Sequence, residues 1–408
     1  MVNQERKARP VESQWRPLSV ESQWRPLAGS AQAIALEVLV NGPLARSELA
    51  RRVNLSQQSL TRLANPLVES GLLVETVSAS DGTRMGRPTR PLDIVPTSHH
   101  FVGIKLTGDS ATGVATTLRA DGVATRSAVI EDHDPAAVTM TVARMVRELA
   151  QEVPDVSGIG ITIGGDAPDG SVVVRSPFLG WTNVPLRALV EEATQLPVVV
   201  ENDLIALMEA ERWFGVGRET DTFALVTIGA GVGFGLLIKG MLVLNDDVGT
   251  GRIGRVGHHI VGDSGPRCAA GHRGCVTAML TTGGIQGAVS AGLGRWVTYE
   301  EVLDLAHTGH PVAAAVIEDA ARGLGRLLAT VADFTMVPTV VLAGEGATIA
   351  DRHRRMLDET LTHSRDPEAA PVAVVVRRSD FIDWARGAAV VAIQSFVSAP
   401  ERRALTDR

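Results

Sequence analysis

Between residues 30 and 71 the apolar side chains recur at intervals of three and four, which places them on one face of a helix. The pattern breaks at Asn41-Gly42-Pro43 and again at Asn54-Leu55-Ser56, so it predicts three helices separated by short turns. Ser56 is suited to cap the third helix, and Pro66 is expected to kink or restart it. Residues 72–75 then have the composition of the first strand of a β-hairpin.

Three helices followed by a hairpin predict a winged helix-turn-helix domain, which we place at residues 29–95. The exposed positions early in its third helix carry Gln, Ser, Thr and Arg, which can read base edges. The hairpin tip carries three arginines around a glycine and a proline, a segment suited to a minor groove. These arginines argue against the alternative, a three-helix interaction domain with no nucleic-acid role. The predicted DNA-binding residues are Arg46, Ser56, Gln57, Gln58, Ser59, Thr61, Arg62, Arg84, Gly86, Arg87 and Pro88.

From about residue 99 the chain alternates short apolar runs with helical patterns. We expect an α/β domain over residues 96–398, built as two lobes around a cleft. The clearest helical pattern covers residues 138–149. The expected strands are residues 101–106, 111–118, 156–163, 198–200, 223–228, 236–239 and 340–343.

Composition and charge narrow the class of protein. Residues 1–95 carry 12 Lys and Arg against 9 Asp and Glu, whereas the remainder is acidic within a total net charge of −7. A basic head on an acidic body suits a DNA-binding module on a sensor domain. The chain has no apolar run of the ~20 residues that a bilayer requires, so we expect no membrane partner. A polar N-terminus and only two cysteines indicate the cytoplasm.

The N-terminal region contains a short duplication. Residues 11–19 recur almost unchanged at 20–28, in a stretch without an apolar face. We expect residues 1–28 and 399–408 to be tails. Trp15 and Trp24 are alternative docking anchors within the repeat.

Several motifs, in order, resemble the ROK family of repressors, open reading frames and sugar kinases, from about residue 25 to residue 398. The resemblance implies an actin/hexokinase-like fold of the ribonuclease H type. The motifs are Gly42-Pro43-Leu44-Ala45-Arg46-Ser47-Glu48-Leu49-Ala50, Gly86-Arg87-Pro88, Glu201-Asn202-Asp203, the series Gly229, Gly231, Gly233 and Gly235, Gly257-His258, the loop from Cys268 to Cys275, and Leu342-Ala343-Gly344-Glu345-Gly346.

The resemblance also indicates that kinase chemistry has been lost. Asp203 stands at the position of the family's catalytic base. The phosphate-binding Asp-x-Gly-Gly-Thr turn reads Lys105-Leu106-Thr107-Gly108-Asp109, so its acidic residue is now a lysine. Because phosphoryl transfer requires the phosphates and magnesium to be held, we expect neither ATP binding nor catalysis. An active sugar kinase with a DNA-binding head is the alternative.

The expected effector-binding residues are Asn202, Asp203, Arg255, His258 and Thr277. Arg255 and Thr277 stand where the family has glutamates that grip sugar hydroxyls. Because guanidinium prefers carboxylate or phosphate partners, we expect an anionic sugar derivative. The alternatives are an Arg255–Asp203 salt bridge that closes an empty pocket, and helix capping as the only role of Asn202 and Asp203.

The resemblance also implies a structural zinc site at His258, Cys268 and Cys275. The family's fourth ligand, a cysteine, is Ala270 here, and structural zinc normally has four protein ligands. His272 or His259 are the candidates to complete the site, although neither stands at the position of the lost ligand.

Together these features predict a sequence-specific DNA-binding regulator, a repressor of carbohydrate-related genes. A homodimer or tetramer on a palindromic operator is expected, because one helix-turn-helix covers a half-site. Residues 387–393 resemble the buried helix that braces such dimers. A regulator without any ligand, whose α/β domain only dimerises, is the remaining alternative.

Overall fold

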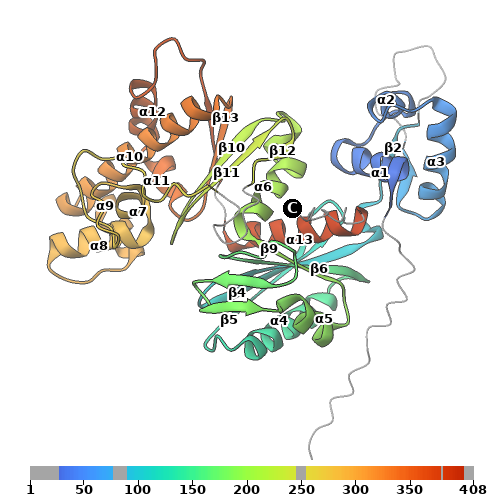
Figure 1. The fold of residues 1–408 in the computed structure, drawn as a ribbon, viewed down its shortest axis with the longest axis horizontal. Helices are drawn as coiled ribbons and strands as arrows, with labels where there is room; N and C mark the ends of the chain where they lie inside the picture. Colours follow the sequence, from blue (N-terminus) through green and yellow to red (C-terminus); the bar gives the residue numbers. More distant parts are fainter. Residues whose placement is uncertain (1–26, 77–89, 245–253, 378–379, 399–408) are drawn as a thin grey trace, which may run out of the picture.

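The computed structural model describes residues 27–76, 90–244, 254–377 and 380–398 (Figure 1). The predicted winged helix-turn-helix is confirmed. Its helices are α1 (Gly29–Asn41), α2 (Arg46–Arg52) and α3 (Gln57–Glu69). The wing is an antiparallel pair, β1 (Leu73–Glu75) and β2 (Leu92–Ile94).

The predicted start of α3 is confirmed, and the predicted restart at Pro66 is wrong. The Ser56 side chain accepts a hydrogen bond from the Ser59 amide at 3.1 Å, which is the predicted cap. Helix α3 continues without interruption through Pro66 to Glu69, and the kink stays a prediction. Pro66 lies on the exposed side, where the carbonyl that loses its intrahelical partner can be hydrated.

The first lobe is a mixed sheet with helices on both faces. Its strand order is β5-β4-β3-β6-β9, in which β3 (His100–Leu106), β6 (Val156–Ile163) and β9 (Val198–Asn202) are parallel. The strands β4 (Ser110–Thr117) and β5 (Gly122–Val129) add antiparallel to one edge. Helices α4 (Pro135–Ala150) and α5 (Leu186–Thr194) pack on one face, and the hairpin β7 (Val173–Ser176) and β8 (Trp181–Val184) lies beside them.

The second lobe repeats this plan with a strand order of β12-β11-β10-β13-β14. Its central strands are β10 (Phe223–Ile228) and β13 (Thr339–Ala343), a parallel pair whose buried side chains are apolar except for Thr227. The remaining strands are β11 (Val232–Ile238), β12 (Met241–Leu242) and β14 (Ala373–Val376). The lobe's helices are α7 (Val276–Leu280), α8 (Thr282–Leu293), α9 (Tyr299–His307), α10 (Pro311–Thr335), α11 (Ala347–Arg352) and α12 (Arg354–His363).

Two helices occupy the junction of the lobes, α6 (Asp203–Phe214) and α13 (Phe381–Val397). Helix α13 covers the second face of the first sheet, where it packs on β3, β4, β6 and β9. Ala388, Ala389 and Val390 are fully buried by their own chain. The predicted burial of residues 387–393 is confirmed, and it comes from their own chain, whereas their role in bracing a dimer stays a prediction.

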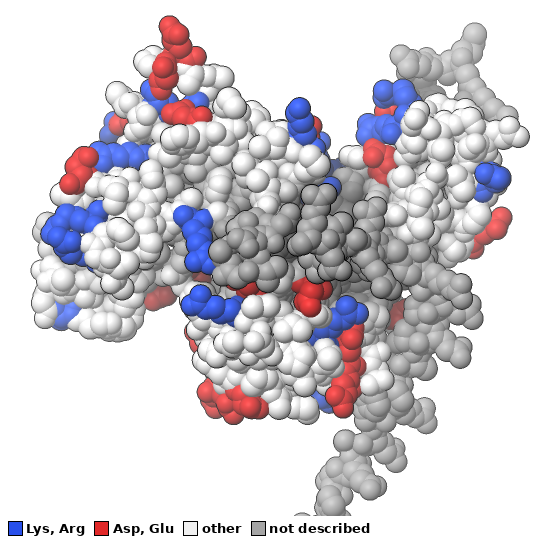
Figure 2. Space-filling model, viewed as in Figure 1, with Lys and Arg blue, Asp and Glu red and all other residues white. Residues whose placement is uncertain are grey.

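Charge is mixed over the face of the molecule that Figure 2 shows. Basic and acidic side chains of the described residues both occur there on the helix-turn-helix and on the lobes. No helix in the described ranges is both long and apolar enough to cross a bilayer.

Candidate effector pocket, metal site and DNA interface

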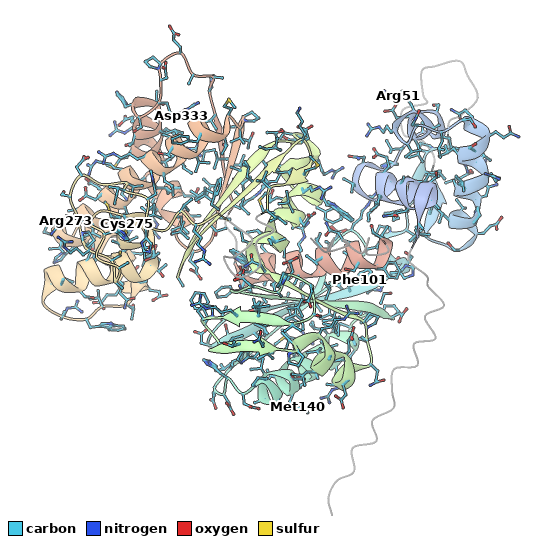
Figure 3. The ribbon with its side chains drawn as sticks, viewed as in Figure 1. Arg51, Phe101, Met140, Arg273, Cys275 and Asp333 are labelled. Carbon is cyan, nitrogen blue, oxygen red and sulfur yellow. The ribbon has the colours of Figure 1, made fainter. Side chains whose placement is uncertain are left out.

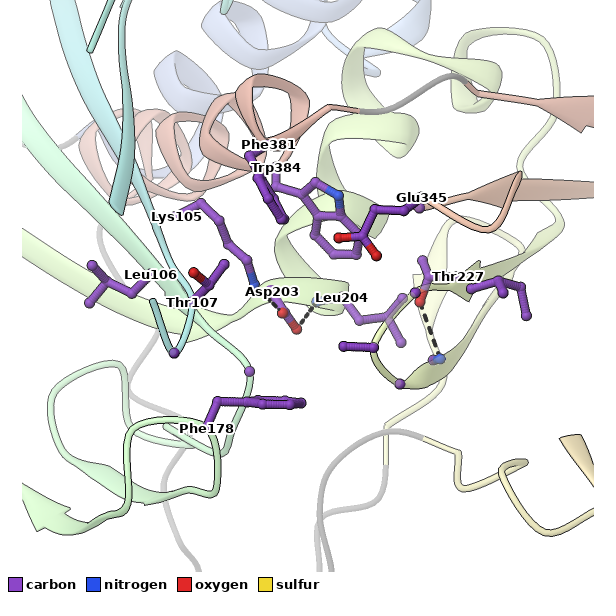
Figure 4. A pocket seen from close by; sticks show the side chains of 18 of the residues that line it. Lys105, Leu106, Thr107, Phe178, Asp203, Leu204, Thr227, Glu345, Phe381 and Trp384 are labelled. Carbon is purple, nitrogen blue, oxygen red and sulfur yellow. Dashed lines mark hydrogen bonds and ion pairs between the residues drawn. The ribbon is translucent and has the colours of Figure 1, made fainter. Parts of the chain in front are cut away.

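A cavity of about 700 Å³ lies between the two lobes, where the carboxyl ends of β3, β9 and β10 meet (Figure 4). This is where open α/β sheets bind ligands, because strand ends leave side chains and helix N-termini facing a crevice. The wall facing these strand ends is built by Gly344-Glu345 and by the first turn of α13. The predicted arrangement of two lobes around a cleft is thus confirmed.

The pocket is dominated by an ion pair between Lys105 and Asp203. Lys105 is 6% exposed, and its ammonium donates a hydrogen bond to Oδ2 of Asp203. The same ammonium lies 5.2 Å from the centre of the Trp384 ring, a cation–π distance. The position of the catalytic base is therefore neutralised by the lysine that replaced the phosphate-turn acid.

Asn202 has all of its side-chain groups in use. Its oxygen accepts from the amides of Leu204 at 2.9 Å and Ile205 at 3.2 Å, and its nitrogen donates to the Gly165 carbonyl at 2.8 Å. The predicted capping role is confirmed. Its role toward a ligand stays a prediction.

The Glu345 side chain lies against the glycine turn that follows β10, at Gly229 and Ala230. The Ala230 amide donates to its carboxylate, and a Cβ placed on Gly229 would lie 2.5 Å from its Oε2. Partial burial raises the pKa of Glu345 above its ordinary value, although the nearby Lys105 ammonium acts to lower it. A protein carboxylate thus takes an amide donor that could otherwise face a bound anion.

The turn after β3 is closed by its own side chains. The Thr107 hydroxyl donates to Oδ1 of Asp109 at 2.7 Å and accepts from the Ser110 amide at 2.9 Å. The Ser110 amide and the Thr107 hydroxyl therefore donate to groups of the turn itself and are not free to bind a phosphate.

Three aromatic side chains line the pocket, Phe178, Phe381 and Trp384. Phe178 follows β7, and its ring atom Cδ2 would be 2.8 Å from a Cβ on Gly164. Sequence reasoning missed all three. The signal that could have found them is a half-exposed aromatic next to a predicted strand or helix end, since solvent-facing aromatics often mark ligand sites.

Three of the five predicted pocket residues lie elsewhere. Arg255 is exposed and does not line the cavity, and the Thr277 hydroxyl donates to the Gly257 carbonyl at 2.7 Å. His258 belongs to the cysteine loop described next. The alternative of an Arg255–Asp203 salt bridge is wrong, because Lys105 is the partner of Asp203.

The cysteine loop brings together a set of metal-ligand atoms ahead of α7. Those of His258, Cys268 and Cys275 lie within 4.8 Å of one another. His272 lies next to this group of three without belonging to it, with its Nδ1 at 3.6 Å from Sγ of Cys268 and its ring centre 4.6 Å from that of His258. His259 turns away, since its Nε2 lies 3.4 Å from the Thr330 hydroxyl.

The chemistry of this loop fits zinc. Although burial acts in the opposite direction, hydrogen bonding from His272 lowers the pKa of the Cys268 thiol to about 6. Burial raises the pKa of the Cys275 thiol. Two thiols and two imidazoles form a common donor set for tetrahedral zinc. Figure 3 shows Cys275 and Arg273 together in this loop, far from the helix-turn-helix.

On the helix-turn-helix, the first turns of α3 present a polar face. Gln57, Gln58, Thr61 and Arg62 are exposed there, whereas Ser59 is half-buried and Ser56 is used as the cap. Arg46 is half-buried and bonded to Glu75 of β1 at 2.8 Å, a contact that lowers the pKa of Glu75. Arg84, Gly86, Arg87 and Pro88 lie outside the described residues.

Comparison with known proteins agrees with this geometry. Residues 101–395 match the ROK family profile, and residues 27–82 match that of the MarR family. The chain belongs to the ROK family. A solved ROK transcriptional regulator, a homologue of the Escherichia coli Mlc protein, has the same fold, with a TM-score of 0.74 and 22% identity over 90% of this chain and 97% of that one.

ROK regulators and ROK kinases are both among the relatives. The xylose repressor of Bacillus subtilis is 25% identical over 66% of this chain and 70% of its own length. The regulator NagC of Escherichia coli K12 is 25% identical over 76% of this chain and 79% of its own. The glucokinase of Thermotoga maritima is 32% identical over 44% of this chain and 57% of its own.

Proposed function

We propose that this ROK protein is a sequence-specific DNA-binding repressor of carbohydrate-related genes. The observation that carries the proposal is the exposed polar face of α3 on a winged helix-turn-helix joined to a ROK domain. Two regulators, the xylose repressor and NagC, align with 66% and 76% of its length. The cytoplasm is the compartment in which such a protein acts.

The same proposal includes the absence of kinase activity. A base that is ion-paired with Lys105 cannot accept a proton from a sugar hydroxyl at neutral pH without breaking that pair. Glu345 brings a negative charge to the glycine turn where phosphates would have to be neutralised. The alternative of an active kinase is tested by coupled ATP hydrolysis with a panel of sugars, for which we expect no turnover.

The deciding experiment selects bound fragments from a random DNA pool with the full chain. We expect one enriched sequence of two half-sites related by a two-fold, since a homodimer places two α3 helices one helical turn apart. Light scattering of the same protein should give a dimer or tetramer. Binding without sequence enrichment would contradict the proposal.

Arg62→Ala is expected to weaken operator binding and to change base preference at one position of each half-site. Arg62 is exposed on the α3 face, where a bidentate contact with guanine contributes about 1–3 kcal/mol. Fluorescence anisotropy with the selected operator and with single-base variants measures both effects. Arg322→Ala, an exposed arginine on α10 in the second lobe, is the matched control and should bind as the wild type does.

The effector class follows from the charges of the pocket. Among the described residues, its lining carries one ammonium, Lys105, and three carboxylates, Asp109, Asp203 and Glu345. An anionic sugar would meet excess negative charge, so the expectation built on Arg255 no longer has its basis. We propose a neutral or amine-bearing sugar, with its apolar face against the aromatic side chains.

Calorimetry with glucose, glucosamine, glucose 6-phosphate and gluconate tests this choice. We expect measurable heats with one or both of the first two and none with the two anions. Tight binding of either anion would overturn the charge argument. No binding by any of the four would favour the closed pocket, with the Lys105–Asp203 pair as its lock.

We further propose that His258, Cys268, His272 and Cys275 hold a structural zinc ion. When bound, zinc would cross-link the loop ahead of α7. His272 would act as the donor in place of the cysteine that Ala270 replaces. The corresponding test is argued in the Discussion.

A further inference from the structure

One helix touches both the pocket and the DNA-binding domain. The first turn of α13 supplies Phe381 and Trp384 to the pocket wall, and Trp384 holds the Lys105 ammonium over its ring. From there α13 runs for 17 residues, about 25 Å at 1.5 Å per residue, toward the helix-turn-helix (Figures 1 and 4). A structural change in the pocket therefore acts directly on the first turn of α13, and the last turn of the same helix lies at the DNA-binding domain.

The middle of α13 lies unusually close to the first-lobe sheet. A Cβ on Gly103 of β3 would lie 1.9 Å from the Ala385 carbonyl oxygen, and one on Gly160 of β6 would lie 1.8 Å from that of Ala388. On its other side, Gly387 approaches the backbone of Ala206 in α6. Glycine at all three positions lets backbone pack on backbone, so bending within this stretch would create clashes.

The far end of α13 shares a hydrophobic core with the helix-turn-helix. Val390, Ile393 and Val397 are buried in one cluster with Ile34 and Val38 of α1. Ser398, which follows α13, forms a parallel β-bridge with Leu27, just before α1. The DNA-binding domain is thus not tethered by a linker alone, and its first helix rests on α13.

We propose that α13 transmits the state of the pocket to the DNA-binding domain as a rigid rod. A ligand that displaces Lys105 from Trp384 changes the packing of the first turn of α13, and the glycine-seated middle carries that displacement to α1 instead of absorbing it. The position of α1 sets that of α3, because both belong to the same small core. This inference rests on the proposed regulatory function only for its biological outcome, since the mechanical coupling exists in the isolated chain.

A double-mutant cycle tests the coupling without requiring an identified ligand. Trp384→Ala perturbs the pocket end, and Ile393→Ala loosens the end at α1. We expect Trp384→Ala to alter amide hydrogen exchange in α1, and to change operator affinity by about 5- to 150-fold, the range of typical allosteric couplings. In the Ile393→Ala background the same pocket substitution should leave α1 exchange almost unchanged.

Trp296→Ala is the control, because this tryptophan is 70% exposed between α8 and α9 and should affect neither measurement. If Ile393→Ala does not fold, Ile393→Val replaces it, because this substitution removes only one methyl group from the same contact. Wild-type exchange of α1 in Trp384→Ala would overturn the proposal, as would an effect that adds unchanged to that of Ile393→Ala. If the wild type binds no operator, the proposed function fails while the exchange cycle still decides the coupling.

Discussion

Asp203→Asn is expected to lower the free energy of unfolding of the first lobe by about 3–5 kcal/mol, because it leaves a buried ammonium without its counter-charge. Lys105 is 6% exposed, and Asp203 is its only carboxylate partner among the described residues. The Trp384 ring offers a cation–π contact of about 2 kcal/mol when desolvated, which is less than the loss expected from breaking the ion pair. Urea unfolding followed by first-lobe hydrogen exchange measures the loss.

The double variant Lys105→Met with Asp203→Asn is the control for this measurement. Replacing both charges by groups of similar volume should recover most of the loss, since the cost lies in the unpaired charge and not in the missing contact. The asparagine also keeps an oxygen for the Leu204 amide, which Asp203 accepts at 2.8 Å. A loss of less than about 1 kcal/mol in Asp203→Asn would show that Lys105 is hydrated rather than held by the pair.

The helices and strands of the fold could be predicted from the sequence because each depends on a local pattern of residues. The helical spacing of the apolar residues at 34, 35, 38 and 39 predicted α1, and the apolar run at residues 156–163 predicted β6 with the bounds that the structure shows. Even the α3 cap at Ser56 follows from one residue type before a periodic stretch. The order of strands within each sheet was not predicted, because these local patterns do not determine it.

Only some of the residues that line the pocket could be predicted from the sequence, because they come from distant parts of the chain. Asn202 and Asp203 were placed correctly since a strand end and a helix start coincide there. The partner of Asp203 is 98 positions away in sequence, and nothing local marked Lys105 as that partner rather than Arg255. Arg255 was chosen for its place in a motif, but its loop carries it to solvent.

Helix α13 illustrates the same limit. Its run of small apolar residues predicted a buried helix, and it is buried. The surface against which α13 packs is determined by Gly103 and Gly160, two strand glycines that let the backbone of α13 approach the sheet closely. Their sequence positions alone do not reveal this contact. A dimer and an intrachain contact are indistinguishable from the sequence of such a helix, and the structure shows the second.

Removing zinc is expected to produce the other large loss of stability. At free zinc about 1,000-fold above Kd, binding would contribute about 4 kcal/mol to the folded state, and a chelator should abolish that contribution. We expect one zinc per chain by elemental analysis. Cobalt substitution should give the absorption of a tetrahedral site with thiolate charge-transfer bands.

His272→Ala separates this site from the three-ligand set that the sequence alone supported. The Nδ1 of His272 lies 3.6 Å from Sγ of Cys268, so its loss should weaken zinc binding and shift the cobalt spectrum away from four protein ligands. His259→Ala is the matched control, because His259 contacts Thr330 and should leave metal content and spectrum unchanged. Metal content well below one per chain in the wild type would contradict the zinc site. An unchanged cobalt spectrum in His272→Ala would show that His272 is not the fourth ligand and would leave the zinc site itself standing. Three protein ligands and a water would then account for the tetrahedral geometry.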